Sequence, residues 1–114
     1  MKKVLIVAKD EIIRTSLKLS FENMKFKTVV ADHAGALNMF FTEEPSAVVI
    51  CDYNEKNKEF KGVETYADIK NSATNEIIFR LGFSKLDHAD YLQIPCDLKE
   101  LNKKLALAMS FQQK

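Results

Sequence analysis

Short apolar runs recur along the chain and alternate with longer segments of mixed polarity. The runs are rich in Val and Ile and have the length of buried strands, and the segments between them have the length of helices. Alternation of this kind predicts a parallel β-sheet whose strands are connected by helices that cross its faces. The expected strands cover residues 3–7, 28–31, 47–51, 77–81 and 91–94.

Four helices are expected from apolar residues at helical spacing. Asp10 is the expected N-cap of the first helix, and Asp97-Leu98-Lys99-Glu100 resembles a capping box at the start of the last. The second and third helices are expected around residues 33–43 and 62–71. The buried faces should comprise, in chain order, Ile13, Leu17, Phe21 and Met24; Leu37, Phe40 and Phe41; Val63, Tyr66 and Ile69; and Leu98, Leu101, Leu105 and Met109.

The connection between the last two expected strands is too short for a full helix. It runs from Gly82 to Asp90, whereas a parallel crossover usually needs about a dozen residues or more. We therefore expect only a short turn over residues 84–88, with Phe83 and Leu86 covering part of the exposed sheet face.

Length and composition indicate one ordinary globular domain over residues 1–114. The hydrophobic fraction is 46% and the formal net charge is +1, which gives no electrostatic reason to expect nucleic acid or an anionic membrane as a partner. No apolar run approaches the roughly 20 residues of a membrane span, so a cytoplasmic location is expected. Cys51 and Cys96 lack C-x-x-C spacing and are expected to be free, buried thiols.

Polar residues follow two of the expected strands at the point where each ends. Asp52 comes directly after residues 47–51, and Ala8-Lys9-Asp10-Glu11 follows residues 3–7. Because open α/β sheets bind their ligands beyond the carboxyl ends of the strands, these residues predict a site at that edge.

Four segments occur in a recognisable order: Val4-Leu5-Ile6-Val7, Val48-Val49-Ile50-Cys51-Asp52-Tyr53-Asn54, Gly62-Val63-Glu64, and Asp90-Tyr91-Leu92-Gln93-Ile94-Pro95-Cys96-Asp97-Leu98. In this order and spacing they resemble the receiver domain of bacterial two-component response regulators, over essentially the whole chain. The resemblance implies an α/β, flavodoxin-like doubly wound fold with a five-stranded parallel sheet of order 2-1-3-4-5. It also implies that Asp52 is the phosphoacceptor equivalent and Tyr91 the aromatic switch equivalent.

The chain departs from that family at most positions of the pocket. The acidic pair that holds Mg²⁺ in receivers is replaced by Ala8 and Lys9, and the neighbouring Asp10 is expected to cap a helix. The Thr or Ser that responds to the phosphoryl group is replaced by Leu81, and the Lys before the proline by Ile94. Together with the short fourth crossover, these changes indicate a degenerate receiver, or pseudo-receiver.

Phosphorylation of a carboxylate normally needs Mg²⁺ to neutralise the incoming charge. Here the Lys9 ammonium should lie roughly 5 Å from the metal position and repel a dication by roughly 2–7 kcal/mol at an effective dielectric of about 20 to 80. We therefore expect no metal at Asp52, and an ion pair of Asp52 with Lys9, direct or through one water. His33 and His88 are expected to be solvated surface residues.

These observations predict a protein-interaction module in signal transduction that works without phosphorylation and is not an enzyme. The expected partner is another protein, such as a histidine kinase or another regulator, or a second copy in a homodimer. The contact surface is expected beside Phe83, Leu86, Tyr91 and the last helix. For Tyr91, a role in partner contact and a purely structural role, as a strand residue with its hydroxyl in water, are equal alternatives.

Two other functions stay open at this point. In one, Asp52 still accepts a phosphoryl group from a histidine kinase or phosphotransferase, with Mg²⁺ as cofactor. In the other, the module is part of a larger regulator or kinase and serves as a dimerisation element.

Overall fold

The computed structural model describes residues 3–54, 61–72, 77–82, 91–93, 99–100 and 103–104. Residues 99–100 and 103–104 are helical, as expected for the last helix. The longer elements are β1 (Lys3–Val7), α1 (Glu11–Asn23), β2 (Lys27–Ala31), α2 (Ala36–Glu43), β3 (Ala47–Ile50), α3 (Gly62–Ser72), β4 (Ile77–Gly82) and β5 (Tyr91–Gln93).

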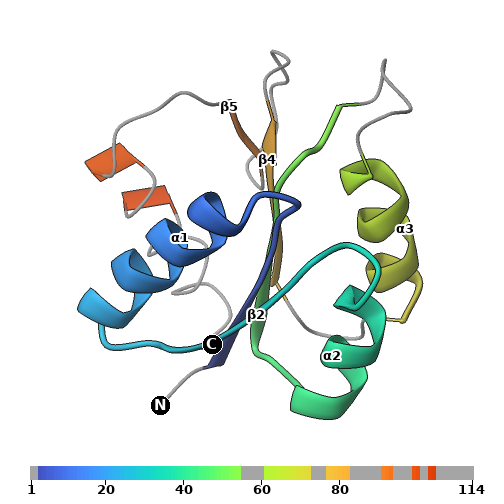
Figure 1. Cartoon of the computed structure of the whole chain (residues 1–114), viewed down its shortest axis with the longest axis horizontal. Coiled ribbons are helices and arrows are strands. Elements are labelled where there is room, and N and C mark those ends of the chain that lie inside the picture. Colours follow the sequence, from blue (N-terminus) through green and yellow to red (C-terminus); the bar gives the residue numbers. More distant parts are fainter. Residues whose placement is uncertain are drawn as a thin grey trace.

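The strands form one parallel sheet in the order β2-β1-β3-β4-β5, which confirms the predicted topology. Helix α1 covers one face of this sheet, and α2 and α3 cover the other (Figure 1). The central strands β1 and β3 are buried along almost their whole length, because helices lie on both of their faces.

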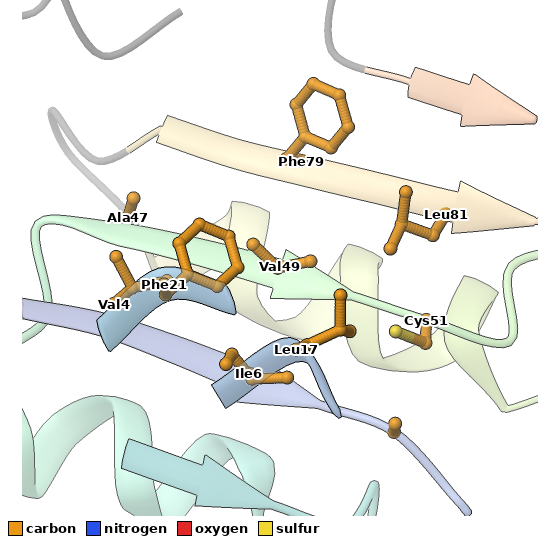
Figure 2. Packing of buried hydrophobic residues seen from close by; sticks show 10 residues of the cluster. Val4, Ile6, Leu17, Phe21, Ala47, Val49, Cys51, Phe79 and Leu81 are labelled. Atoms are coloured by element: carbon orange, nitrogen blue, oxygen red, sulfur yellow. The ribbon is translucent and has the colours of Figure 1, made fainter. Parts of the chain in front are cut away.

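The core between α1 and the sheet is built from alternate residues of the strands (Figure 2). Asp10 caps α1 as predicted, since its Oδ1 accepts a hydrogen bond of 2.7 Å from the Ile12 amide. The apolar face of α1 packs against the sheet through Leu17 and Phe21. The buried residues of this core are Val4, Ile6, Ala8, Leu17, Phe21, Ala47, Val49, Cys51, Phe79 and Leu81.

On the opposite face, α2 and α3 pack against the other alternate residues of the strands. Phe40 and Ile69 are buried there as predicted, and Leu37 and Tyr66 pack at the edge of the cluster. Phe41 was also expected in this core, but 59% of it is exposed. Successive helical residues point about 100° apart, so only one of two adjacent phenylalanines can face the sheet.

Several expectations fall outside the described residues: the turn over residues 84–88 with Phe83, Leu86 and His88, the pocket residue Ile94, the thiol of Cys96, and the apolar face Leu98, Leu101, Leu105 and Met109. In the described part of the chain, no helix has the length and apolar character needed to span a bilayer.

Candidate functional site

Asp52 stands at the carboxyl edge of the sheet, two residues beyond the end of β3. Its backbone is left-handed, with φ 58°, a conformation that Asp tolerates better than most residues. The Gly62 amide, at the start of α3, donates to the Asp52 carbonyl at 3.0 Å. A Cβ at Gly62 would lie 2.4 Å from that carbonyl oxygen, so glycine is required for the helix to begin this close to Asp52.

One oxygen of the Asp52 carboxylate is held by two donors. Oδ2 accepts the backbone amide of Lys9 at 2.7 Å, and it lies 2.9 Å from Nε2 of His33. The His33 and Asp52 side chains are only 9% and 16% exposed, so water screens this pair weakly. Oδ1 has no hydrogen-bond partner among the described residues, which leaves one oxygen of the carboxylate uncommitted.

The second nitrogen of His33 extends the network to α3. Nδ1 lies 2.8 Å from the hydroxyl of Thr65, a residue that is only 5% exposed. An ionised carboxylate can only accept, so Nε2 carries the hydrogen toward Asp52. In a neutral imidazole Nδ1 therefore accepts from the Thr65 hydroxyl, and in an imidazolium it donates to it. In both states every polar atom of the His33 ring is satisfied.

The surface role expected for His33 is therefore wrong. His33 lies two residues beyond β2, which is next to β1 in the sheet, and parallel strands all end at the same edge. This edge argument, applied to the end of β2 as it was to residues 8–11, would have identified His33 from the sequence. Thr65 carries no such signal, because only the docking of α3 brings it to the imidazole.

An Asp, a His and a hydroxyl residue in a row resemble the atoms of a hydrolytic triad, but the surroundings differ. The hydroxyl of Thr65 belongs to a buried residue inside α3, where a substrate carbonyl has no approach. The network consequently acts as a clamp that fixes His33 between the sheet edge and α3, with no accessible nucleophile.

The clamp also sets the ionisation of Asp52. The hydrogen bond from His33 is the main cause that lowers the pKa of Asp52 below its ordinary value of 3.8. The Lys9 amide and the charges of His33 and Lys9 make smaller contributions in the same direction, and partial burial acts against them. Burial, and secondarily the Asp52 charge, raises the pKa of the Cys51 thiol to about 12. Asp52 is thus an anion at neutral pH and Cys51 is a neutral thiol. Cys51 is free and buried, as the sequence predicts.

Ala8 and Lys9, at the positions of the receiver acidic pair, have no side-chain oxygen that could serve as a metal ligand beside Asp52. Ala8 is fully buried in the core under α1, and Lys9 is exposed. The direct pair expected between the Lys9 ammonium and Asp52 is not formed; the contact is made by the Lys9 backbone amide. Asp10 is committed to capping α1. Within the described ranges, no group of three or more His, Cys, Asp or Glu residues could hold a metal ion, so these residues do not fit Mg²⁺.

The other predicted pocket residues contribute differently from expectation. The Leu81 side chain lies in the core under α1, and its carbonyl accepts the Tyr53 amide at 3.1 Å. Tyr91 is 1% exposed, so it neither forms a surface patch nor places its hydroxyl in bulk water. Its ring lies 6.0 Å from that of Tyr53, in an edge-to-face contact. Position 94 is outside the described residues.

No protein-family model and no curated protein matches the chain. Solved structures do match. A two-component response regulator from Clostridium difficile superposes with a TM-score of 0.79 at 19% identity, over 96% of this chain and 97% of that one. The signal receiver domain of a Luxo repressor protein from Vibrio parahaemolyticus gives a TM-score of 0.79 at 13% identity, over 98% and 92% of the two chains.

Longer proteins contain the same fold as one part. NtrX from Brucella abortus superposes with a TM-score of 0.82 at 16% identity, and the match covers 98% of this chain but 27% of NtrX. The chain therefore spans about a quarter of that protein. From the sheet order, the placement of the helices and these superpositions, we conclude that the chain has the receiver-domain fold of the two-component response regulators.

Proposed function

We propose that this protein is a degenerate receiver that acts in signal transduction by binding another protein, independently of phosphorylation at Asp52. One observation carries the proposal: His33 and the Lys9 amide converge on the oxygen Oδ2 of Asp52, at 2.9 and 2.7 Å. Two internal N–H donors thus hold the carboxylate that receivers present to a metal and a phosphodonor.

The metal chemistry of a receiver has no support at this edge. Mg²⁺ requires near-octahedral oxygen ligands, and the described residues contain no group of three or more His, Cys, Asp or Glu that could hold a metal ion. The positive charge of Lys9 opposes a dication at the same place. Without a metal, the charge that develops on a transferred phosphoryl group is not neutralised, and transfer is slow.

The phosphoacceptor function is the second candidate, and one observation favours it. The oxygen Oδ1 of Asp52 accepts no hydrogen bond from the described residues, and the side chain is 16% exposed. This oxygen could attack the phosphorus of a phosphodonor and displace the donor's leaving group. Under this second function, Mg²⁺ would be needed to neutralise the charge on the transferred phosphoryl group.

Exposure to a small phosphodonor separates the two functions. The protein is incubated with acetyl phosphate and millimolar Mg²⁺, and the intact mass is measured beside an active receiver domain that carries the acidic pair. We expect the active receiver to gain a phosphoryl group and this chain to gain none. A phosphoryl adduct that is lost in Asp52→Asn would overturn the proposal.

The interaction role is tested by measuring binding to a partner protein, which is to be sought among kinases and regulators. Binding should be the same for the native chain and for Asp52→Asn, with or without phosphodonor. The apolar residues Phe83 and Leu86 stay the predicted contact residues, and their joint replacement by Ser should weaken association while circular dichroism is unchanged. Loss of binding in Asp52→Asn alone would contradict a phosphorylation-independent mode.

A further inference from the structure

A hollow lies where the last turns of α2 and α3 meet. Helix α3 begins beside Asp52 and runs with α2 to the other edge of the sheet (Figure 1). The hollow has a volume of about 190 Å³ and is lined by Phe40, Phe41, Glu44 and Ser72. Drug-sized ligands occupy sites of about 300–1,000 Å³. The size of the hollow therefore suits a single long side chain better than a small-molecule ligand.

One wall of the hollow is an aromatic pair from α2. The rings of Phe40 and Phe41 meet edge to face, with their centres 5.7 Å apart. Phe40 is buried in the core beneath α2, whereas Phe41 is 59% exposed. The face of an aromatic ring carries partial negative charge and attracts a cation. The wall thus offers an anchored apolar surface that suits the stem and the charged end of a cationic side chain.

Glu44 forms the polar rim of the hollow and has an unusual backbone. It ends α2 in the left-handed conformation, with φ 49° and ψ 57°, where Gly or Asn is the usual residue. Pro45 follows it, although proline normally holds the residue before it in an extended conformation. Strained residues of this kind cluster at functional sites. An exposed Glu at this position indicates that its carboxylate is used.

The charges around the hollow favour a cation. Lys3 is committed to Glu43 at 3.1 Å, and Lys70, in the last turn of α3, donates to the Tyr66 hydroxyl at 3.0 Å. Within the described part of the chain, no cation is paired with the Glu44 carboxylate. The carboxyl ends of both helices also meet here, and each is the negative end of a helix dipole.

We propose that this hollow binds an arginine side chain of a partner protein. The planar guanidinium stacks on the exposed ring of Phe41 and donates to the carboxylate of Glu44, whereas the strongly hydrated ammonium of lysine suits such a site less well. A second copy of this chain does not supply the group. Of its two arginines, Arg14 donates to the Ala8 carbonyl at 2.7 Å and Arg80 is only 5% exposed. The partner is therefore a different protein.

A minimal probe tests the site without a known partner. N-acetyl-arginine methylamide is titrated into the native chain, beside its uncharged citrulline analogue. We expect saturable amide shifts at Phe41, Glu44 and Ser72 with the arginine probe, a Kd of about 1–10 mM, and at least about fivefold weaker binding of the citrulline analogue.

Matched variants assign the binding to the two groups. Glu44→Gln and Phe41→Ala should each raise the Kd about two- to fivefold. Glu64→Gln, which removes an exposed carboxylate at the other end of α3, and Leu19→Ala, which removes an apolar residue that is 58% exposed on α1, should leave the Kd unchanged.

Glu44→Gly tests the link between backbone strain and binding. Glycine adopts the left-handed conformation without strain, so this variant should unfold in urea at the native midpoint or above it, and should bind as weakly as Glu44→Gln. A lower midpoint would assign Glu44 to the fold and overturn the proposal.

Three binding results would also overturn the proposal: no saturable shift with the arginine probe up to about 50 mM, equal binding of the citrulline or the lysine analogue, or native affinity in Glu44→Gln. The site goes beyond the proposed function, because it uses neither Asp52 nor the predicted contact residues Phe83 and Leu86. None of these results depends on the phosphodonor experiment, so the two proposals fail separately.

Discussion

The bond between His33 and Asp52 should be measurable as a coupling free energy in a double-mutant cycle. The cycle comprises the native chain, His33→Ala, Asp52→Asn and the double variant, each unfolded in urea at pH 7. A hydrogen bond to a charged group contributes about 1.5–3 kcal/mol to stability. His33→Ala also leaves the hydroxyl of Thr65 without its imidazole partner. We therefore expect His33→Ala to lower the free energy of unfolding by about 2–4 kcal/mol, with a coupling to Asp52 of about 1–3 kcal/mol.

The lowered pKa of Asp52 predicts how the stability contributed by this pair depends on pH. The folded-state pKa of Asp52 lies below 3.8, its ordinary value, so the unfolded chain takes up the proton first as the pH falls. The contribution of ionised Asp52 is then fully present above pH 3.8 and is lost as the pH drops through the lower folded-state value. Urea unfolding at neutral pH and at decreasing pH below 3.8 should show the native chain losing stability relative to Asp52→Asn.

Two controls make the result decisive. A cycle between His33 and Thr65 should give a smaller coupling, about 0.5–1.5 kcal/mol, because a neutral hydroxyl replaces the carboxylate. Asp68→Asn, which neutralises an exposed carboxylate on α3, should change stability by no more than about 0.5 kcal/mol. A coupling between His33 and Asp52 below about 0.5 kcal/mol at pH 7 would show that the clamp does not hold the carboxylate.

Three further predictions follow from the same edge of the sheet. Gly62→Ala should destabilise the fold by more than about 2 kcal/mol in thermal unfolding, because the added Cβ would lie 2.4 Å from the Asp52 carbonyl oxygen. Gly35→Ala is the control and should be near neutral, because its Cβ would meet only a side-chain oxygen at 3.3 Å. Millimolar Mg²⁺ should leave the Lys9 amide resonance unshifted in an NMR titration, and saturable binding below about 1 mM would contradict the ligand argument. In a Cys96→Ser variant, the Cys51 thiol should resist a disulfide reagent at pH 8 until urea unfolds the chain, since burial raises its pKa to about 12.

The sequence by itself determined the architecture. Five Val- and Ile-rich runs separated by amphipathic segments allow few arrangements other than a parallel sheet with helices on both faces, and the start of α1 was predicted from Asp10. These signals are local: each depends on the period of a strand or a helix, or on one cap. The position of Asp52 at the carboxyl edge is equally predictable, because it follows a strand that is buried on both sides.

Tertiary structure decided what surrounds Asp52. The sequence assigned Lys9 as its partner, yet the main-chain amide of Lys9 and the imidazole of His33 hold the carboxylate. Which group approaches a carboxylate depends on strand order, which places the end of β2 beside that of β1, and on where α3 docks. The contact of the Arg80 guanidinium with the rings of Tyr53, Tyr66 and Tyr91 has the same origin. These tyrosines come from three different elements or loops, and no spacing along the chain encodes their meeting at Arg80, because only the packing of β4, β5 and α3 brings them together.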